Sequence, residues 1–290
     1  MWPRRNKRGR SRILTCRKIA AILPPDSLDL CFKGTRMATI SALYRHPVKG
    51  LSPEAIPEAA LEAGGHFPCD RLFALENGPS GFDAAAPEHM PKIKFLMLMR
   101  NERLARLATQ YDPATRILAI RQGEAVATAG DVRTAEGRQA IERFFASYMG
   151  AELRGPVRLL DAPAGFRFMD SRSGHISILN RRTIDAIAAS IGRETLDERR
   201  FRGNVLVEGM EAFAENELVG RKLRLGTAEL EVIKRIERCA ATDVDPESGI
   251  RDTGLVAALM RAFNHRDCGI YARITKGGTI RIGDRLQPLE

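Results

Sequence analysis

The chain has 290 residues, of which 44% are hydrophobic, so it can form one large domain or two ordinary ones with a real core. No run approaches the ~18 to 20 apolar residues that a membrane-spanning helix needs. The net charge of +10 first suggests a nucleic-acid partner, but residues 1–36 alone carry ten Lys and Arg against two Asp and Glu. The remaining 36 basic and 34 acidic residues leave a net charge of +2, so the charge does not indicate nucleic-acid binding.

The basic leader, residues 1–36, lacks the design of a signal peptide because its apolar stretches are short and interrupted by LPPD. The sharp change in composition after it predicts that the leader is disordered or not translated, with Met37 as the true start. An arm that binds an anionic surface is the alternative. We expect a protein that begins at Met37 to fold normally.

From residue 38 onward, most of the chain is expected to form short strands separated by Gly and Pro. These strands are ISALYRHPV, RLFALE, FLMLM, RLATQYD, ILAIRQ, VRLLD, NVLVEG, KLRLG, AELEVI, GIYARI and TIRIGD. Many short strands with few helices predict an α+β, mostly β fold with barrels or strongly curved sheets. A domain boundary is predicted near residue 155, with one domain over residues 37–155 and the other over residues 156–290.

Three amphipathic helices are expected among these strands, over residues 138–150, 181–192 and 255–263. Asn180 is the expected N-cap of the second helix, and Thr253 that of the third. The apolar faces carry Ile141, Phe144, Phe145 and Tyr148, then Ile184, Ile187 and Ile191, then Leu255, Val256, Leu259 and Phe263.

The five cysteines form an odd and scattered set, namely Cys16, Cys31, Cys69, Cys239 and Cys268. Without a CxxC pair or a secretory signal, they favour a reducing, cytoplasmic location over a disulfide framework. No GxxxxGK[ST], GxGxxG, HExxH or GxSxG occurs, so ATPase, Rossmann, zincin and α/β-hydrolase activities lack their defining loops.

Several arginines stand at positions that local structure does not explain. Arg181 and Arg182 open a helix, where the macrodipole disfavours positive charge, so either a nearby anion binds them or both are solvated. Arg199, Arg200 and Arg202 come just before a buried strand. Their guanidinium groups suit bidentate contacts with phosphate, and a solvated loop is the equal alternative.

Four further polar residues lie near strand edges and are ambiguous by themselves. Lys49 in HPVKG and Arg71 in CDRLFAL would usually be surface charges. His46 and His66 lie near them, and a lone histidine is more often structural than catalytic. Cys239, in ERCAATDVDPESG, would usually be a small buried apolar residue.

Together, however, these segments resemble a known family. LYRHPVKG and CDRLFAL resemble the N-terminal β-barrel domain that precedes a MOSC domain. RRFRGNVLVEG, ERCAATDVDPESG and GIYARITKGGTIRIGDRL resemble the MOSC domain itself, which is named after the C-terminus of molybdenum cofactor sulfurase. The arrangement, over about residues 38–290, is similar to the mitochondrial amidoxime-reducing component and its bacterial relatives. It implies a MOSC β-barrel domain preceded by a smaller β-rich domain.

The resemblance also implies roles for individual residues. Cys239 would be the protein thiolate on molybdenum, and therefore both metal ligand and catalytic residue, with Asp245 of the same motif as a second catalytic residue. The residues implied to hold the anionic molybdenum cofactor are Lys49, Arg71, Asn180, Arg182, Arg200, Arg202, Asn204 and Thr242. Physical chemistry agrees, because molybdenum is soft enough to prefer thiolate and a phosphate-bearing pterin needs a cationic cradle.

The implied function is a molybdenum-cofactor-dependent reductase that removes oxygen from N-hydroxylated compounds, giving amine or amidine and water. Its expected partners are the small substrate and an external electron-donor protein of ferredoxin, flavoprotein or cytochrome type, without nucleic acid or membrane. The alternative is a non-enzymatic carrier of the cofactor, or of sulfur as a persulfide on Cys239. At the family level there is also an association with pyridoxal phosphate binding. Gly50, where relatives often have Ser, and the unusual segment GFDAAAPEHMPKIKF leave the substrate open.

Overall fold

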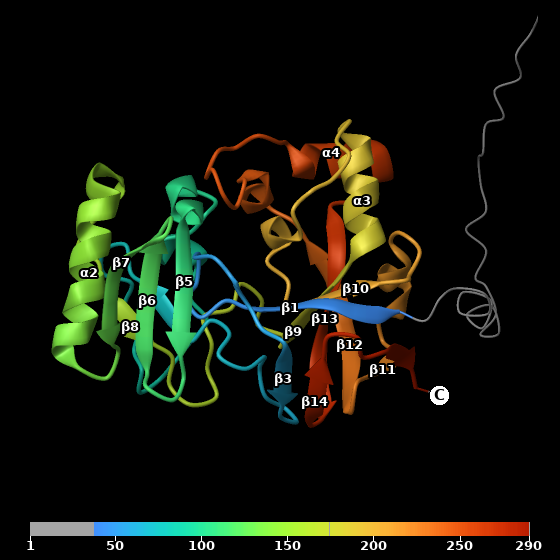
Figure 1. Ribbon diagram of the computed structural model, residues 1–290, viewed down its shortest axis with the longest axis horizontal. Helices are drawn as coiled ribbons and strands as arrows, with labels where there is room; N and C mark the ends of the chain where they lie inside the picture. The colour runs from blue at the N-terminus through green and yellow to red at the C-terminus, as the bar shows by residue number, and fades with distance from the viewer. Residues whose placement is uncertain (1–37, 174, 290) are drawn as a thin grey trace, which may run out of the picture. The chain divides into compact units, whose positions relative to one another are not determined.

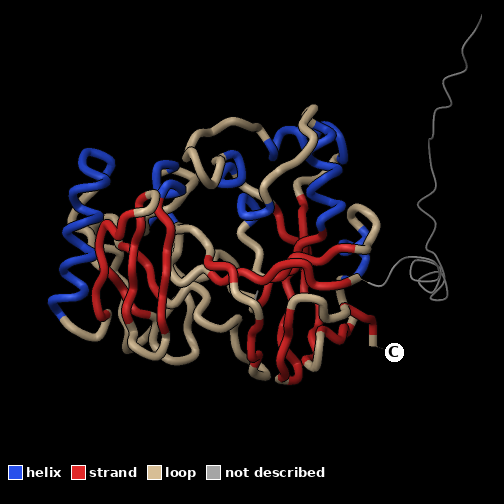
Figure 2. Tube along the Cα trace, in the orientation of Figure 1, coloured by secondary structure: helices blue, strands red, loops and turns tan. Residues whose placement is uncertain are grey.

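The computed structural model describes residues 38–173 and 175–289, so the prediction for the leader lies outside the described residues. Within them the chain forms fifteen strands and three α-helices, joined by short 3₁₀ turns (Figures 1 and 2). The predicted α+β, mostly β fold is therefore confirmed. None of the helices in this part of the chain combines the length and the apolar character needed to cross a membrane.

The bounds of the elements are as follows. The strands are β1 (Thr39–Arg45), β2 (Glu54–Ala55), β3 (Glu58–Leu61), β4 (Phe73–Leu75), β5 (Leu107–Asp112), β6 (Ile117–Gln122), β7 (Ala125–Asp131), β8 (Leu159–Asp161), β9 (Ile176–Asn180), β10 (Val205–Glu208), β11 (Lys222–Leu225), β12 (Ala228–Glu237), β13 (Asp267–Lys276), β14 (Gly278–Arg281) and β15 (Leu286–Pro288). The α-helices are α2 (Ala135–Met149), α3 (Arg181–Ser190) and α4 (Leu255–Phe263).

The largest sheet has eight strands in the order β15-β11-β12-β13-β9-β10-β1-β2. Only β9 and β10 run parallel, with Val205 opposite Ile178, and α3 lies in the connection between them. All other neighbours in the sheet are antiparallel. Figure 1 shows α3 and α4 at one end of this sheet, where Ile184, Ile187 and Leu259 pack in one core cluster with Leu206.

A second sheet, with strand order β5-β6-β7, is covered by α2. The burial pattern of β5 alternates strictly, as expected for a strand with one face in the core. Ile141 and Phe145 of α2 share a core cluster with Leu118 and Ile120 of β6. Two short pairs, β14 with β3 and β4 with β8, complete the strand pairing.

Strand β1 comes from the N-terminal half but joins the large sheet between β10 and β2. Asn204, fully buried just before β10, fixes this junction. Its side-chain oxygen accepts hydrogen bonds from the amide (3.1 Å) and hydroxyl (2.8 Å) of Ser177, while its Nδ2 donates to the Tyr44 carbonyl (3.2 Å). One amide thus connects β9, β10 and β1.

The predicted helices are present, and two details of the sequence interpretation need correction. Asn180 does cap α3, by accepting from the Arg182 amide (3.1 Å). Thr253, in contrast, does not cap α4; the Asp243 carboxylate accepts from the Leu255 amide (2.8 Å) instead. The segment FLMLM, predicted as a strand, follows a 3₁₀ turn over Lys92–Lys94 and makes only an isolated bridge, in which Phe95 lies opposite Glu76 beside β4.

We expect Asn204→Ala to lower the free energy of unfolding by about 2 kcal/mol or more, because it leaves buried groups of Ser177 and Tyr44 without partners. Urea denaturation measures this change. Gln139→Ala removes an exposed amide from α2 and serves as the control, with an expected change within about 0.5 kcal/mol. Equal stabilities of the two variants would contradict the role of Asn204.

Candidate functional site

Cys239 lies two residues after the end of β12, and its backbone is held from both sides. Before it, the Arg238 guanidinium donates to the carbonyls of Cys268 (Nε, 2.8 Å) and Phe201 (Nη1, 2.6 Å). After it, the amide and the hydroxyl of Thr242 both donate to the Cys239 carbonyl, each at 3.0 Å. The thiol is half-buried and not in a disulfide, and its Sγ accepts a hydrogen bond from Lys92 Nζ at 3.6 Å.

The close approach of β13 to Ile178 and Arg238 requires a glycine at position 269. Gly269 of β13 has a φ of +83°, and a Cβ there would lie 2.5 Å from the Ile178 carbonyl oxygen and 3.3 Å from Arg238 Nη2. The missing side chain therefore lets the Arg238 guanidinium reach the backbone of β13.

Two adjoining hollows of about 60 and about 500 Å³ meet at Cys239. They share Arg71, Lys92, Asp170, Arg202, Cys239, Ala241 and Tyr271. The larger hollow is lined by seven cations and two acids. Its cations are Arg71, Lys92, Arg200, Arg202, Lys234, Arg235 and Arg238, and its acids are Asp170 and Glu237. Such an excess of positive charge attracts an anionic ligand.

Arg71 is not the surface charge that its position alone would suggest. It adopts a φ of +50°, a strained conformation for a residue with a side chain, and donates to the Asp70 carboxylate, to His46 Nδ1 (3.1 Å) and to the Arg202 carbonyl (3.1 Å). Burial lowers the pKa of Arg71, but the neighbouring Asp70 charge outweighs this effect and the pKa is raised. Arg71 thus remains a fixed cation.

Arg202 also has a left-handed backbone, with a φ of +52°. Its Nη1 donates to the Leu51 carbonyl (2.6 Å), and it forms no direct ion pair with a carboxylate in residues 38–173 and 175–289. Burial and then the charge of Arg71 lower its pKa to about 10. Near neutral pH it is therefore a half-buried guanidinium without a direct ion pair in the described residues, and an anion bound beside it would be favourable.

Lys49 lines the smaller hollow and is also buried. Its Nζ donates to the Phe168 carbonyl (3.0 Å) and forms an ion pair with Asp170. Burial lowers the pKa of Lys49, and Asp170 partly offsets this effect. Burial also raises the pKa of Asp170, but Lys49 outweighs it and brings that pKa to about 2.

Asp245, predicted to be catalytic, lines neither hollow. One of its oxygens accepts from the amide (2.8 Å) and hydroxyl (2.9 Å) of Ser248, and the other accepts from Arg200 (2.7 Å). Arg200 is held further by Asp252 (2.8 Å). Asp245 shapes the turn after Cys239 and fixes Arg200, which does line the larger hollow together with Thr242. The catalytic role of Asp245 stays a prediction.

Three predicted cofactor-binding residues also lie outside both hollows. Asn180 is fully buried and donates to the Glu211 carbonyl (2.7 Å) and the Glu215 carboxylate (2.9 Å). Arg182 is exposed and pairs with the Glu211 carboxylate. The side-chain amide of Asn204 hydrogen-bonds to Ser177 and Tyr44 within the large sheet. The anion anticipated at the start of α3 is thus a carboxylate of the chain itself, as it is for Arg181, which pairs with Glu198 at 2.9 Å.

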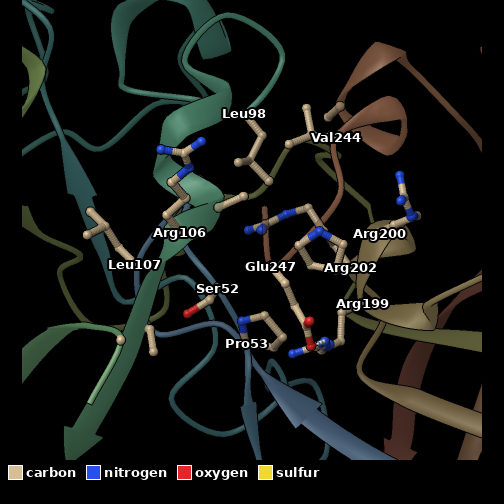
Figure 3. A pocket seen from close by; sticks show the side chains of 15 residues that line it. Ser52, Pro53, Leu98, Arg106, Leu107, Arg199, Arg200, Arg202, Val244 and Glu247 are labelled. Carbon is tan, nitrogen blue, oxygen red and sulfur yellow. Dashed lines mark hydrogen bonds and ion pairs between the residues drawn. The ribbon is translucent and has the colours of Figure 1, made fainter. Parts of the chain in front are cut away.

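A third cavity, of about 240 Å³, lies beyond Arg202 and Ala241 (Figure 3). It is lined by Leu98 and Val244 and by four arginines. Arg199 there is already neutralised by Asp197 (2.5 Å) and Glu247 (2.9 Å). Arg202 lines this cavity as well as both hollows, whereas Cys239 lines only the hollows.

Sequence reasoning missed Lys92, Asp170, Arg238 and Tyr271. Arg238 could have been found, because it directly precedes the cysteine in the quoted segment. Lys92 and Asp170 lie in irregular segments, PKIKF and FMDSRS, whose path through space the sequence does not indicate. Tyr271 lies in β13, and burial raises the pKa of its hydroxyl. Its side chain is therefore uncharged where it lines the two hollows.

Two family models match the chain. The MOSC domain matches residues 166–287, and the MOSC N-terminal beta barrel domain matches residues 37–152. Because the two matches span most of the chain, it belongs to the family of MOSC-domain proteins with a MOSC N-terminal beta barrel domain. The family predicted from the sequence is confirmed.

Individual relatives match over shorter stretches. The molybdenum cofactor sulfurase of Caenorhabditis briggsae is 31% identical over 99 residues, 33% of this chain and 14% of that protein. The mitochondrial amidoxime reducing component 2 of Homo sapiens is 29% identical over 96 residues, 29% of this chain and 28% of that protein. Each match thus covers less than a third of the relative. The solved YUAD protein from Bacillus subtilis has a TM-score of 0.43 and 16% identity, covering 87% of this chain and 94% of that chain.

The buried histidine beside Arg71 predicts a dependence of stability on pH. Burial and then the Arg71 charge lower the pKa of His46 to about 3, whereas an unfolded histidine titrates near about 6.5. Between these values the unfolded state binds the extra proton, so stability falls as the pH falls. The slope from His46 is at most about 1.4 kcal/mol per pH unit.

We therefore expect His46→Gln to show a flatter decline of the free energy of unfolding between about pH 6 and about pH 4 than the wild type. Urea denaturation at a series of pH values measures the slopes. Identical slopes would contradict a neutral, buried His46.

Proposed function

We propose that this protein binds the molybdenum cofactor between Cys239 and the surrounding cations and uses it to reduce N-hydroxylated compounds. The observation that carries the proposal is the Cys239 thiol facing a cation-lined hollow beside the unpaired guanidinium of Arg202. Membership of the MOSC family supports the cofactor, since relatives include a molybdenum cofactor sulfurase. Similarity to an amidoxime reducing component supports the reaction.

The residues present fit such a group. No cluster of three or more His, Cys, Asp or Glu in the described ranges could hold a metal ion by itself. A metal that arrives with a dithiolene needs only one further soft ligand, which a single thiolate supplies. Cys268 does not compete for this role, because burial raises the pKa of its thiol to about 12.

The cations would hold the phosphate end of the cofactor. Lys49 and Arg71 come from the N-terminal half and Arg202 from the C-terminal half, and all three line the smaller hollow. Guanidinium groups offer paired N–H donors that match phosphate oxygens, and charge-assisted bonds of this kind are about twice as strong as neutral ones. The two halves thus contribute to one anion site.

When bound, the molybdenum cofactor would supply two-electron, oxygen-accepting chemistry at the metal. The chain's own contribution is to position the sulfur: Arg238 and Thr242 fix the backbone on either side of Cys239. Lys92 Nζ lies close enough to the sulfur (3.6 Å) to hydrogen-bond a thiolate there. The electrons come from an external donor protein.

We expect Cys239→Ala to abolish reduction of an N-hydroxylated test compound, such as benzamidoxime, by chemically reduced, cofactor-loaded protein. Cys239→Ser should also lower the rate steeply, because an alkoxide is a harder donor than a thiolate. Both variants should fold, since the half-buried thiol is outside any disulfide and its hydrogen bond is to the side chain of Lys92.

Cys69→Ser is the matched control, because this half-buried thiol lines neither hollow, and it should retain the wild-type rate. A wild-type rate in Cys239→Ala would reject the reductase mechanism. It would leave the non-enzymatic carrier of cofactor or sulfur as the better explanation.

A further inference from the structure

The cavity of about 240 Å³ beyond Arg202 lies next to the proposed reaction site. Leu98, Arg202 and Ala241 line both this cavity and the smaller hollow at Cys239, so the two spaces adjoin. Cys239 itself lines the hollow and not the cavity. A molecule that occupies the cavity can therefore extend one end toward the thiol across this shared boundary.

The walls of the cavity combine apolar and charged side chains. Leu98, Leu107 and Val244 provide apolar surface. Figure 3 shows Arg106 on the same side of the cavity as Leu107, and Arg199 on the opposite side. An apolar cavity of about 150 Å³ is large enough to bind benzene, so about 240 Å³ accommodates a substituted ring.

The four arginines that line the cavity differ in how their charges are balanced. Arg199 and Arg200 are each paired with two carboxylates, and Glu247, which also lines the cavity, is one of the partners of Arg199. Arg202 has no direct ion pair in the described residues, but in the proposed function it binds the cofactor. Arg106 likewise forms no ion pair with a carboxylate in residues 38–173 and 175–289. In the cofactor-loaded protein, Arg106 is therefore the cation that remains for another ligand.

The Arg106 side chain is exposed, yet the turn after Cys239 fixes its position. Its Nε donates to the Ser248 carbonyl (2.6 Å). Gly249, with a φ of +67°, packs so closely that a Cβ there would lie 3.1 Å from Arg106 Cγ. The Nη groups make no hydrogen bond within the described residues. A ligand can therefore bind a guanidinium that is already positioned, which reduces the entropy lost on binding.

We propose that this cavity is the substrate recess and that Arg106 makes it favour N-hydroxylated compounds with a carboxylate on an apolar body. The inference rests on the proposed function, because it names the substrate class of the same site. The apolar body packs against Leu107 and Val244, the carboxylate accepts from Arg106, and the N-hydroxylated end faces the hollow at Cys239. Arg106 determines specificity and does not touch the reacting atoms.

The preference follows from a comparison of two compounds that share one ring. Both bury the same apolar surface in the recess, so this contribution cancels between them. The carboxylate of one adds a charge-assisted pair with Arg106, and a guanidinium can make such a pair with two parallel hydrogen bonds. Because Arg106 is exposed, water and salt screen the pair, and we expect a gain of about fivefold at low salt.

Benzamide and 4-carbamoylbenzoate are suitable probes, because an unreactive amide replaces the amidoxime and the two differ by one carboxylate. NMR titration of cofactor-free protein near neutral pH and at low salt measures both dissociation constants. We expect the wild type to bind 4-carbamoylbenzoate about fivefold or more tighter than benzamide. Arg106→Gln should weaken 4-carbamoylbenzoate about fivefold and leave benzamide unchanged. Arg106→Lys keeps the charge and should bind the carboxylate more tightly than Arg106→Gln does.

A second variant tests whether the probes occupy the recess. Ala108 is an exposed residue of β5 that lines the cavity, so Ala108→Trp fills the space without disturbing the core. It should weaken both probes alike. Arg103→Gln is the matched control for Arg106→Gln, because Arg103 lies in the same 3₁₀ turn, pairs with Glu152 (3.5 Å) and lines neither the cavity nor the hollows. It should leave both constants unchanged.

An unchanged ratio in Arg106→Gln would overturn the proposal, as would an equal loss of both probes in that variant, which would indicate a merely structural role. Unchanged binding in Ala108→Trp, or no measurable binding of either probe to the wild type, would also overturn it. If any of these occurs while reduction still depends on Cys239, the inference about Arg106 alone fails. A ratio that depends on Arg106 in a protein that cannot retain molybdenum would instead support the carboxylate site and reject the proposed function.

Discussion

The site depends on one constraint, which is the close approach of two half-buried guanidinium groups, Arg71 and Arg202, at the same hollow. Arg202 donates to the Leu51 carbonyl, and partial burial and then the charge of Arg71 lower its pKa to about 10. Two neighbouring, half-buried cations repel each other in the isolated fold and become favourable around a bound anion. Both arginines also have left-handed backbones, and strain of this kind is concentrated at functional sites. The fold thus stores electrostatic and conformational energy at one place.

The arrangement of the sheets explains how residues distant in sequence meet there. Strand β1 joins the large sheet beside β10, and this pairing brings Lys49 and Arg71, which follow β1, towards Arg202, which precedes β10. At the end of β12, the hydrogen bonds of Arg238 with β13 position Cys239 at the same hollows as Arg202. Neither half of the chain contains both the thiol and all of its cations. The anion site and the metal ligand are therefore products of the paired halves.

Much of this site could be predicted from the sequence, because Cys239, Lys49 and Arg202 lie in short motifs at strand ends. Other predicted residues lie outside the hollows, for physical reasons. Asn204 has the expected place in its motif, but its side-chain amide hydrogen-bonds to neighbouring strands of the large sheet. A motif does not show which way a side chain points. The acidic turn contains Asp245. Its carboxylate oxygens accept hydrogen bonds from the backbone of the same turn and from Arg200. Contacts between irregular segments, such as the ion pair between Lys49 and Asp170, depend on tertiary packing. No periodic pattern in the sequence predicts them.

The central claim is that Cys239 and the cations around Arg202 form a binding site for the molybdenum cofactor. The most direct test is the molybdenum content per chain of protein purified from a host that makes the cofactor, compared with that of Arg202→Ala. The account predicts close to one molybdenum per wild-type chain and about tenfold less retention in Arg202→Ala at limiting cofactor. Wild-type protein without molybdenum, or full retention in Arg202→Ala, would contradict it.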